Sequence, residues 1–163
     1  MDIDKVKNLF NQGRYQDAYN AAKNYIDSEN GDSIDWLNLL AKSAMKIKSY
    51  DQSRLALEKI IKKKPTDFII LKDLGNLYRL QGNASKAKDF YLKSIEINSK
   101  YAPAITNLGS LIFFKDSDFN RGLDLLNKAV VCDENLLIGW INLAKAYYQI
   151  HSFTKSINAC KKV

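Results

Sequence analysis

The sequence predicts an all-α chain that is built as an array of helix–turn–helix units. Two columns of residues repeat along its 163 positions. The first column is Leu39, Leu74, Leu108 and Leu143, at steps of 35, 34 and 35 residues. The second is Tyr15, Tyr50, Ala84, Phe119 and Phe153, at steps of 35, 34, 35 and 34, with a small residue three positions after each. A fixed period of this length indicates a repeat architecture.

Within one period the apolar residues have helical spacing. The first helix of the third unit carries Leu71, Leu74, Gly75 and Tyr78 at i, i+3, i+4 and i+7. Gln81-Gly82-Asn83 is a turn signal, and Ala87, Tyr91, Ser94 and Ile95 then mark a second helix.

The element boundaries follow from caps and charges. Asp67, Asp118 and Ser152 stand where helix N-caps belong, and the run 62–64 of lysines suits a helix C-terminus. The predicted units are 1–32, 33–67, 68–101, 102–136 and 137–163, the last one truncated. The second and fourth units hold one extra residue, which we place in the turn between their helices.

This pattern resembles the tetratricopeptide repeat family, whose 34-residue signature is Trp, Leu, Gly, Tyr, Ala, an aromatic residue, Ala and Pro. In those places the third unit has Leu71, Leu74, Gly75, Tyr78, Ala87, Tyr91, Ser94 and Ser99. The fifth unit begins its match with Trp140, Leu143, Ala144 and Tyr147. The resemblance covers essentially the whole chain as about four and a half repeats, and it implies a right-handed α-solenoid.

The last unit carries an apolar stripe of Ile157, Cys160 and Val163 with no helix after it. Because the last helix of a solenoid needs a polar outer face, we expect a fragment of a longer protein. A natural end with a short last helix is the alternative. We expect Ile157 and Val163 to be partly exposed or covered by another molecule, which leaves a homo-oligomer through this end open.

Composition narrows the functional classes. No apolar run is long enough to span a bilayer, and the start, MDIDKVKNLF, does not resemble a signal peptide. Cys132 and Cys160 form no disulfide framework, so we interpret them as small core residues of a cytoplasmic protein. The net charge is +7, but the one dense basic run, 62–64, lacks interleaved aromatic residues, so we do not expect a nucleic-acid partner.

No catalytic pattern is present in the sequence. His151 is the single histidine, it lies in a predicted turn, and one histidine cannot form a two-histidine metal site. There is no phosphate-binding glycine loop and no G-x-S-x-G motif. We therefore expect no enzyme, no cofactor and no metal in this segment.

The candidate binding residues lie on the first helices, which line a concave groove in the tetratricopeptide family. Asn38, Asp73, Asn107 and Asn142 stand one residue before the leucine column. They resemble the asparagine ladder of the O-linked N-acetylglucosamine transferase superhelix, where amides hold the backbone of a bound peptide. An amide can pair with a peptide N–H and C=O together. The alternative is that these side chains cap or bridge neighbouring helices.

Other predicted groove residues are mixed in character: Lys72, Asn76, Arg79, Phe113, Lys145 and Tyr148. Lys72, Asn76 and Asn107 match three of the five places of the family's carboxylate clamp, which grips the C-terminal carboxylate of chaperone tails. The other two places would fall at Ile138 and Asn142, so the clamp is incomplete.

We expect a protein-interaction module that binds an extended peptide or a helix of a partner protein in the groove. One alternative is the substrate-targeting arm of a larger enzyme, for example a glycosyltransferase, with its catalytic domain beyond residue 163. Another is a self-assembling scaffold.

Overall fold

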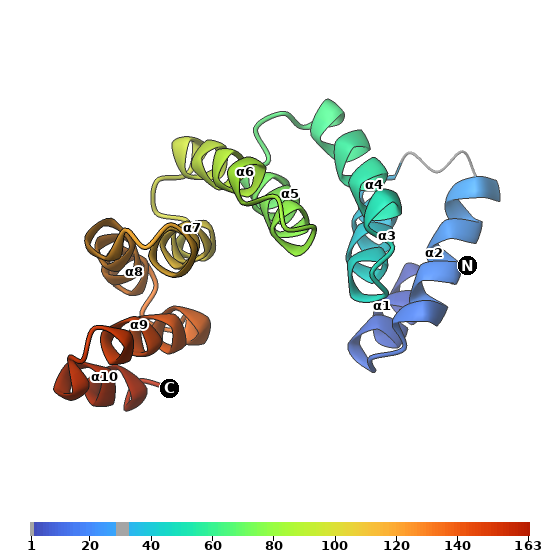
Figure 1. Cartoon of the computed structure of the whole chain (residues 1–163). Coiled ribbons are helices and arrows are strands. Elements are labelled where there is room, and N and C mark those ends of the chain that lie inside the picture. The colour runs from blue at the N-terminus through green and yellow to red at the C-terminus, as the bar shows by residue number, and fades with distance from the viewer. Residues whose placement is uncertain (1, 29–32) are drawn as a thin grey trace. The chain divides into compact units, whose positions relative to one another are not determined.

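The computed structural model describes residues 2–28 and 33–163, and in this part of the chain every regular element is a helix. This confirms the predicted all-α class (Figure 1). The helices are α1 (Ile3–Asn11), α2 (Tyr15–Ser28), α3 (Ile34–Lys46), α4 (Tyr50–Lys63), α5 (Phe68–Leu80), α6 (Ala84–Ile97), α7 (Ala102–Lys115), α8 (Phe119–Cys132), α9 (Leu137–Gln149) and α10 (Phe153–Cys160).

The chain forms two compact units, Met1–Gln81 and Gly82–Val163. The boundary falls between α5 and α6, inside the predicted third repeat, 68–101. The first unit therefore holds α1 to α5 and the second holds α6 to α10.

In the first unit, consecutive helices pack on one another, and aromatic contact joins neighbouring repeats. The ring of Trp36 on α3 stacks on Tyr25 of α2, with ring centroids 4.0 Å apart. Leu57 and Ile60 of α4 are fully buried. The leucine column is buried here through Leu39 and Leu74, as its helical spacing requires, whereas Tyr15 and Tyr50 of the second column are only half-buried.

In the second unit, the core joins α7 and α8 to α9. Phe113, Leu126, Val130, Leu143 and Ala146 form one buried cluster. Trp140 and Tyr147 pack against this cluster from α9, and Trp140 Nε1 also donates a hydrogen bond to the carbonyl of Glu134 at 2.7 Å.

The turns inside the repeats share one geometry. Each turn is three residues long, and its middle residue has a positive φ: Gly13, Lys48, Gly82, Ser117 and His151. In several turns the residue after it donates its backbone N–H to a carbonyl five residues earlier, as from Ser49 to Ala44 at 2.8 Å. This left-handed closure satisfies carbonyls at the end of the first helix.

The extra residue of the second and fourth repeats is not in the turn, and that prediction was wrong. After the leucine column, α3 and α7 continue for seven residues, whereas α5 and α9 continue for six. Because the turn geometry is fixed, the additional residue lies in the first helix, between the leucine column and the turn. It lengthens α7 to 14 residues, whereas α3 begins one residue nearer to its leucine and keeps the 13 residues of α5 and α9.

Small residues sit where the two helices of a repeat approach. Ser53 Oγ donates to the carbonyl of Ala41 at 3.0 Å, and Ser156 Oγ donates to that of Ala144 at 2.9 Å. At the same column, a Cβ added to Gly122 would lie 2.5 Å from Phe113 Cβ. The residues at this position are small because the facing helix leaves no space for a larger side chain.

The helix starts agree with two of the predicted caps. Asp67 accepts hydrogen bonds from the backbone N–H groups of Ile69 and Ile70, both at 3.1 Å, and Asp118 accepts one from Arg121 at 3.2 Å. Ser152 occupies the N-cap position of α10 but makes no side-chain cap hydrogen bond.

Candidate functional site

The predicted polar column begins in the first unit with Asn38 on α3 and Asp73 on α5. Asn38 is half-buried, and its side-chain carbonyl oxygen, Oδ1, is buried without a hydrogen-bond partner among the described residues. Asp73 is buried and forms an ion pair with Lys72 through Oδ1, while its Oδ2 has no partner in the same part of the chain. Both side chains thus hold an acceptor that no described donor reaches.

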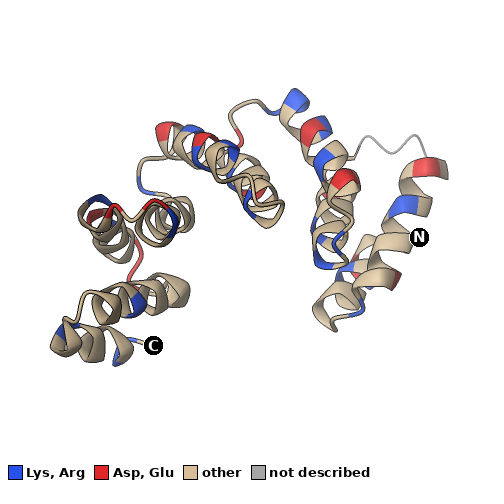
Figure 2. Ribbon diagram, viewed as in Figure 1, with Lys and Arg blue, Asp and Glu red and all other residues tan. Residues whose placement is uncertain are grey.

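A basic hollow of about 380 Å³ lies in the first unit. Its lining residues are Phe10, Lys42, Met45, Lys46, Lys48, Tyr50, Asn76, Arg79 and Leu80. The predicted residues Asn76 and Arg79 therefore share one surface. The three lysines were not predicted. Their close spacing along α3 and the following turn, where Figure 2 shows basic residues, is the feature of the sequence that could have indicated a basic surface.

A smaller hollow adjoins it and contains Asn38. Phe10 and Lys42 line both hollows, so the two share a wall. Lys7, Asn11, Asp35 and Leu39 complete the smaller one. The Asn38 side chain, with its unpartnered Oδ1, therefore stands on the same face as the cations of the basic hollow.

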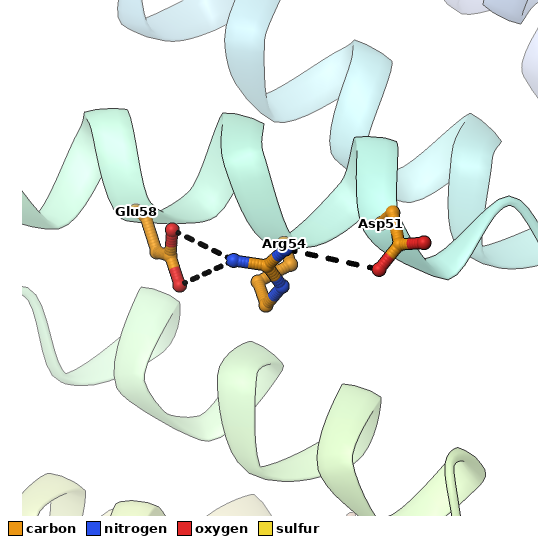
Figure 3. A network of polar contacts seen from close by, with 3 residues as sticks. All are labelled: Asp51, Arg54 and Glu58. Atoms are coloured by element: carbon orange, nitrogen blue, oxygen red, sulfur yellow. Dashed lines mark hydrogen bonds and ion pairs between the residues drawn. The ribbon is translucent and has the colours of Figure 1, made fainter.

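The carboxylates of the first unit are largely engaged elsewhere. Arg54 on α4 lies between Asp51 and Glu58, at 3.8 and 3.2 Å (Figure 3). The hydrogen bond to Glu58 and the charge of that carboxylate raise the pKa of Arg54 above the ordinary value. These three residues are not among those that line either hollow.

In the second unit, the predicted residues Asn107 on α7 and Asn142 on α9 are both half-buried. The equivalence of these residues depends on which end of the first helix is used for counting. From the first residue of the helix, the same position is occupied by Asp73, Asn107 and Asn142.

From the last residue of the helix, next to the turn, one position is shared by Asn38 and Asn107. The following position is shared by Asp73 and Asn142. The extra residue in α3 and α7 therefore divides the column into two pairs.

Phe113 is not a groove residue, and this prediction needs correction. Its side chain is 0% exposed in the core of the second unit, where α8 and α9 pack on it. The cause is the extra residue within α7. Counted from the turn, Phe113 is equivalent to Tyr147, a core position, whereas Phe114 is equivalent to Tyr148.

Counting from the turn yields a consistent surface column of Met45, Arg79, Phe114 and Tyr148. Met45 and Arg79 line the basic hollow of the first unit, and Phe114 and Tyr148 line a groove in the second. Arg79 and Tyr148 were predicted to lie on this surface, whereas Phe114 was missed because the sequence alone did not place the extra residue.

The groove of the second unit has a volume of about 750 Å³ and is mainly apolar. Its lining residues are Phe114, Ile141, Ala144, Lys145, Tyr148, Gln149, Ser156, Cys160 and Val163. We call it the apolar groove. The predicted residues Lys145 and Tyr148 are therefore brought together here, on α9.

The apolar groove exposes a column that is buried in the earlier repeats. Ala22, Leu57, Tyr91 and Leu126 stand four residues after the small column and are each 0% exposed. The equivalent Cys160 is exposed, so its prediction as a core residue was wrong. Ile157 and Val163, at 57% and 58%, are exposed as predicted.

The three matches to the carboxylate clamp divide between the units, because Lys72 and Asn76 lie in the first and Asn107 in the second. Lys72 already pairs with Asp73. Ile138, where the clamp would need a basic residue, is 47% exposed.

Two further observations concern the described residues as a whole. No three of their His, Cys, Asp or Glu side chains are grouped so that they could hold a metal ion. Among these residues no helix has the length and apolar character needed to cross a membrane. His151 is exposed in its turn, as predicted, with its ring against Phe153 at 5.8 Å.

Comparison with known sequences shows similarity to one protein family over part of the chain. The model of the tetratricopeptide repeat matches residues 73–101. The rice protein named probable UDP-N-acetylglucosamine–peptide N-acetylglucosaminyltransferase SPINDLY (Oryza sativa subsp. japonica) is 35% identical over 63 residues. That alignment covers 39% of this chain and 7% of the rice protein.

Comparison with solved structures shows the fold. TTC0263, described as a thermophilic TPR protein of Thermus thermophilus, superimposes with a TM-score of 0.81 at 15% identity, over 98% of this chain and 86% of that chain. YrrB, described as a TPR protein with an unusual peptide-binding site, has a TM-score of 0.64 at 12% identity, over 98% of this chain and 81% of that chain.

Proposed function

Because the chain is a tetratricopeptide repeat protein, we propose that it is a protein-interaction module that binds an extended segment of a partner on its first helices. The observation that carries the proposal is the buried, unpartnered Oδ1 of Asn38 beside a hollow in the first unit. A buried acceptor without a donor is costly, and a peptide N–H in the hollow would satisfy it once the half-buried Asn38 side chain turns toward that hollow. The proposal assigns no catalytic step to these residues.

Asn107 extends the proposal to the second unit. Counted from the turn it is equivalent to Asn38, and Asn142 stands on the next first helix. Side-chain amides can pair with the backbone of an extended chain without selecting its side chains. The peptide-binding site in the description of YrrB is consistent with this type of function in a protein of the same fold.

The test uses extended peptides selected on the intact chain from a display library. Asn38→Ala should weaken binding about two- to twelvefold, since one hydrogen bond contributes about 0.5–1.5 kcal/mol. Asn107→Ala with Asn142→Ala should weaken it at least as much. The matched control is Asn24→Ala, an exposed amide on α2 that lines neither hollow.

Peptides methylated on alternate backbone nitrogens provide a second readout. If the amides bind the backbone, methylation should abolish binding while exchange of side chains is tolerated. The opposite pattern would contradict backbone recognition. Binding that survives the asparagine substitutions but is lost on charge reversal of Lys62 and Lys64 would place the contact outside the first helices.

A second candidate function is self-association through the apolar groove. The exposure of Cys160, Ile157 and Val163, at a face that is buried in earlier repeats, favours it. Exposed apolar surface of this kind is typical of interaction sites. Sedimentation should then show a concentration-dependent dimer that Cys160→Lys, a substitution in the lining of the apolar groove, removes. A strict monomer at high concentration would exclude it.

The third candidate is the targeting arm of a larger enzyme, such as a glycosyltransferase. It is favoured by the similarity to the rice protein, whose name describes an N-acetylglucosaminyltransferase, although the aligned part covers 7% of that protein. The immobilised chain should then enrich from an extract the proteins that carry N-acetylglucosamine. Equal enrichment by the Asn38→Ala, Asn107→Ala and Asn142→Ala variant would contradict targeting by these helices.

A further inference from the structure

We infer that the basic hollow of the first unit binds an acidic segment of a partner protein, in which carboxylate side chains flank an apolar one. This inference rests on the proposed function, because it specifies the chemistry of the segment that the first helices would bind.

The first support is the charge of the hollow. Four cationic side chains line it, from Lys42, Lys46, Lys48 and Arg79, and no carboxylate does. Within the described residues none of the four forms an ion pair. Lys46 Nζ lies 5.4 Å from the centroid of the Tyr15 ring, a cation–π contact that holds the side chain without adding an opposite charge.

The second support is the position of the local acids. Asp4 pairs with Lys7 at 3.1 Å, and Asp17 pairs with Arg14 at 2.7 Å. Asp51 and Glu58 pair with Arg54, and Asp73 pairs with Lys72. These five acids are thus paired with other cations. Asp35 is the one carboxylate in the linings of the two hollows, which together hold the cations of Lys7, Lys42, Lys46, Lys48 and Arg79, so positive charge dominates this surface.

The third support is the apolar part of the same lining. Phe10, Met45, Tyr50 and Leu80 line the hollow together with the cations, and Phe10 packs edge-on against Tyr15 with ring centroids 5.1 Å apart. Apolar walls strengthen the field of the charges that they surround. They also provide a place for one apolar side chain, which a free inorganic anion would leave empty.

An extended segment suits this geometry because the hollow adjoins Asn38. Phe10 and Lys42 belong to both hollows, so a chain that places its carboxylates among the lysines can continue past the Asn38 amide. Charge and apolar contact would select the segment, and the amide would bind its backbone.

The experiment compares two labelled peptides by fluorescence anisotropy on the intact chain. One alternates glutamates with leucine and phenylalanine, and the other has every glutamate replaced by glutamine. The acidic peptide should bind at least about tenfold more tightly, and its affinity should fall as salt is raised toward about 0.5 M. Amide chemical shifts should change at Phe10, Tyr50 and Asn76.

The variants test the location. Lys42→Glu with Arg79→Glu should weaken binding of the acidic peptide at least about tenfold, because like charges then face it. The matched control is Lys23→Glu with Lys59→Glu. It changes the net charge of the first unit equally, at exposed helix positions outside both hollows. Circular dichroism verifies that both variants remain helical.

The outcomes separate the two proposals. Equal affinity for the two peptides, or equal loss in the control variant, overturns the acidic selectivity and leaves backbone recognition intact. Absence of binding by either peptide at about 1 mM also overturns the inference, and the display selection then decides the proposed function. Tighter binding of a single-stranded oligonucleotide, lost in Lys42→Glu with Arg79→Glu, would assign the hollow to nucleic acid instead.

Discussion

At the scale of the residue, Gly122 decides how closely α7 and α8 pack. An added Cβ would lie 2.5 Å from Phe113 Cβ and 2.7 Å from its backbone Cα and N. The backbone cannot yield as a side-chain tip can. In an isolated helix, replacing glycine by alanine would stabilise the helix by about 1 kcal/mol. A loss of stability on Gly122→Ala would therefore come from the contact with α7.

We predict that Gly122→Ala destabilises the chain by about 1–3 kcal/mol, because overpacking outweighs the gain in helix propensity. Urea denaturation followed by circular dichroism measures the change. An unchanged or increased free energy of unfolding would show that α7 and α8 are not in the described contact.

The middle residue of each turn carries a second prediction. Ser117 has a φ of 59°, where an L-residue is strained, whereas Gly82 adopts 79° without a Cβ. Ser117→Gly should stabilise the chain by about 0.5–1 kcal/mol, and Gly82→Ala should destabilise it by a similar amount. Thermal denaturation of the two variants should therefore shift in opposite directions, and shifts of the same sign would refute the shared turn geometry.

At the scale of the element, the helix caps differ in a way that their residue types do not reveal. The carboxylate of Asp67 caps two backbone N–H groups of α5, whereas Ser152 at the start of α10 makes no such bond. Asp67→Ala should cost about 0.5–2 kcal/mol, and Ser152→Ala should cost little. Denaturant midpoints measure both, and equal losses would contradict the difference.

The elements also show which parts of the fold the sequence could predict. A repeat buries its core with its own columns, so a 34- or 35-residue period was enough to predict helix, turn and helix. Because Asp67 and Asp118 have few alternatives before an apolar helix, their caps were predictable as well. Whether an extra residue enters a turn or a helix depends on tertiary contacts, and the repeating positions in the sequence carry no information about these contacts.

The misplacement of that one residue accounts for the error in the site. With the extra residue placed in the turn, every position in the last part of α7 was assigned one residue too early. Phe113 was therefore predicted to line the groove, and the exposed Phe114 was overlooked. The cations of the basic hollow were missed for another reason. Lys42 and Lys46 are four residues apart and so share a face of α3, but the hollow forms only where Phe10 of α1 and Arg79 of α5 join that face.

At the scale of the whole molecule, the two compact units predict that damage stays local. In repeat proteins, stability is the sum of terms for each repeat and its neighbours. Gly122→Ala should therefore accelerate hydrogen exchange in α7, α8 and α9 more than in α3 and α4. Uniform acceleration across both units, measured by mass spectrometry, would contradict this expectation.

The neighbour-to-neighbour packing of the helices has a kinetic consequence. The principal contacts join helices that are consecutive or next but one, as in α7 with α8 and α9. Chains with short-range contacts close small loops first and fold rapidly, within microseconds to milliseconds in helical proteins. During synthesis, each helix pair can thus find its partner soon after it leaves the ribosome, without waiting for the C-terminus.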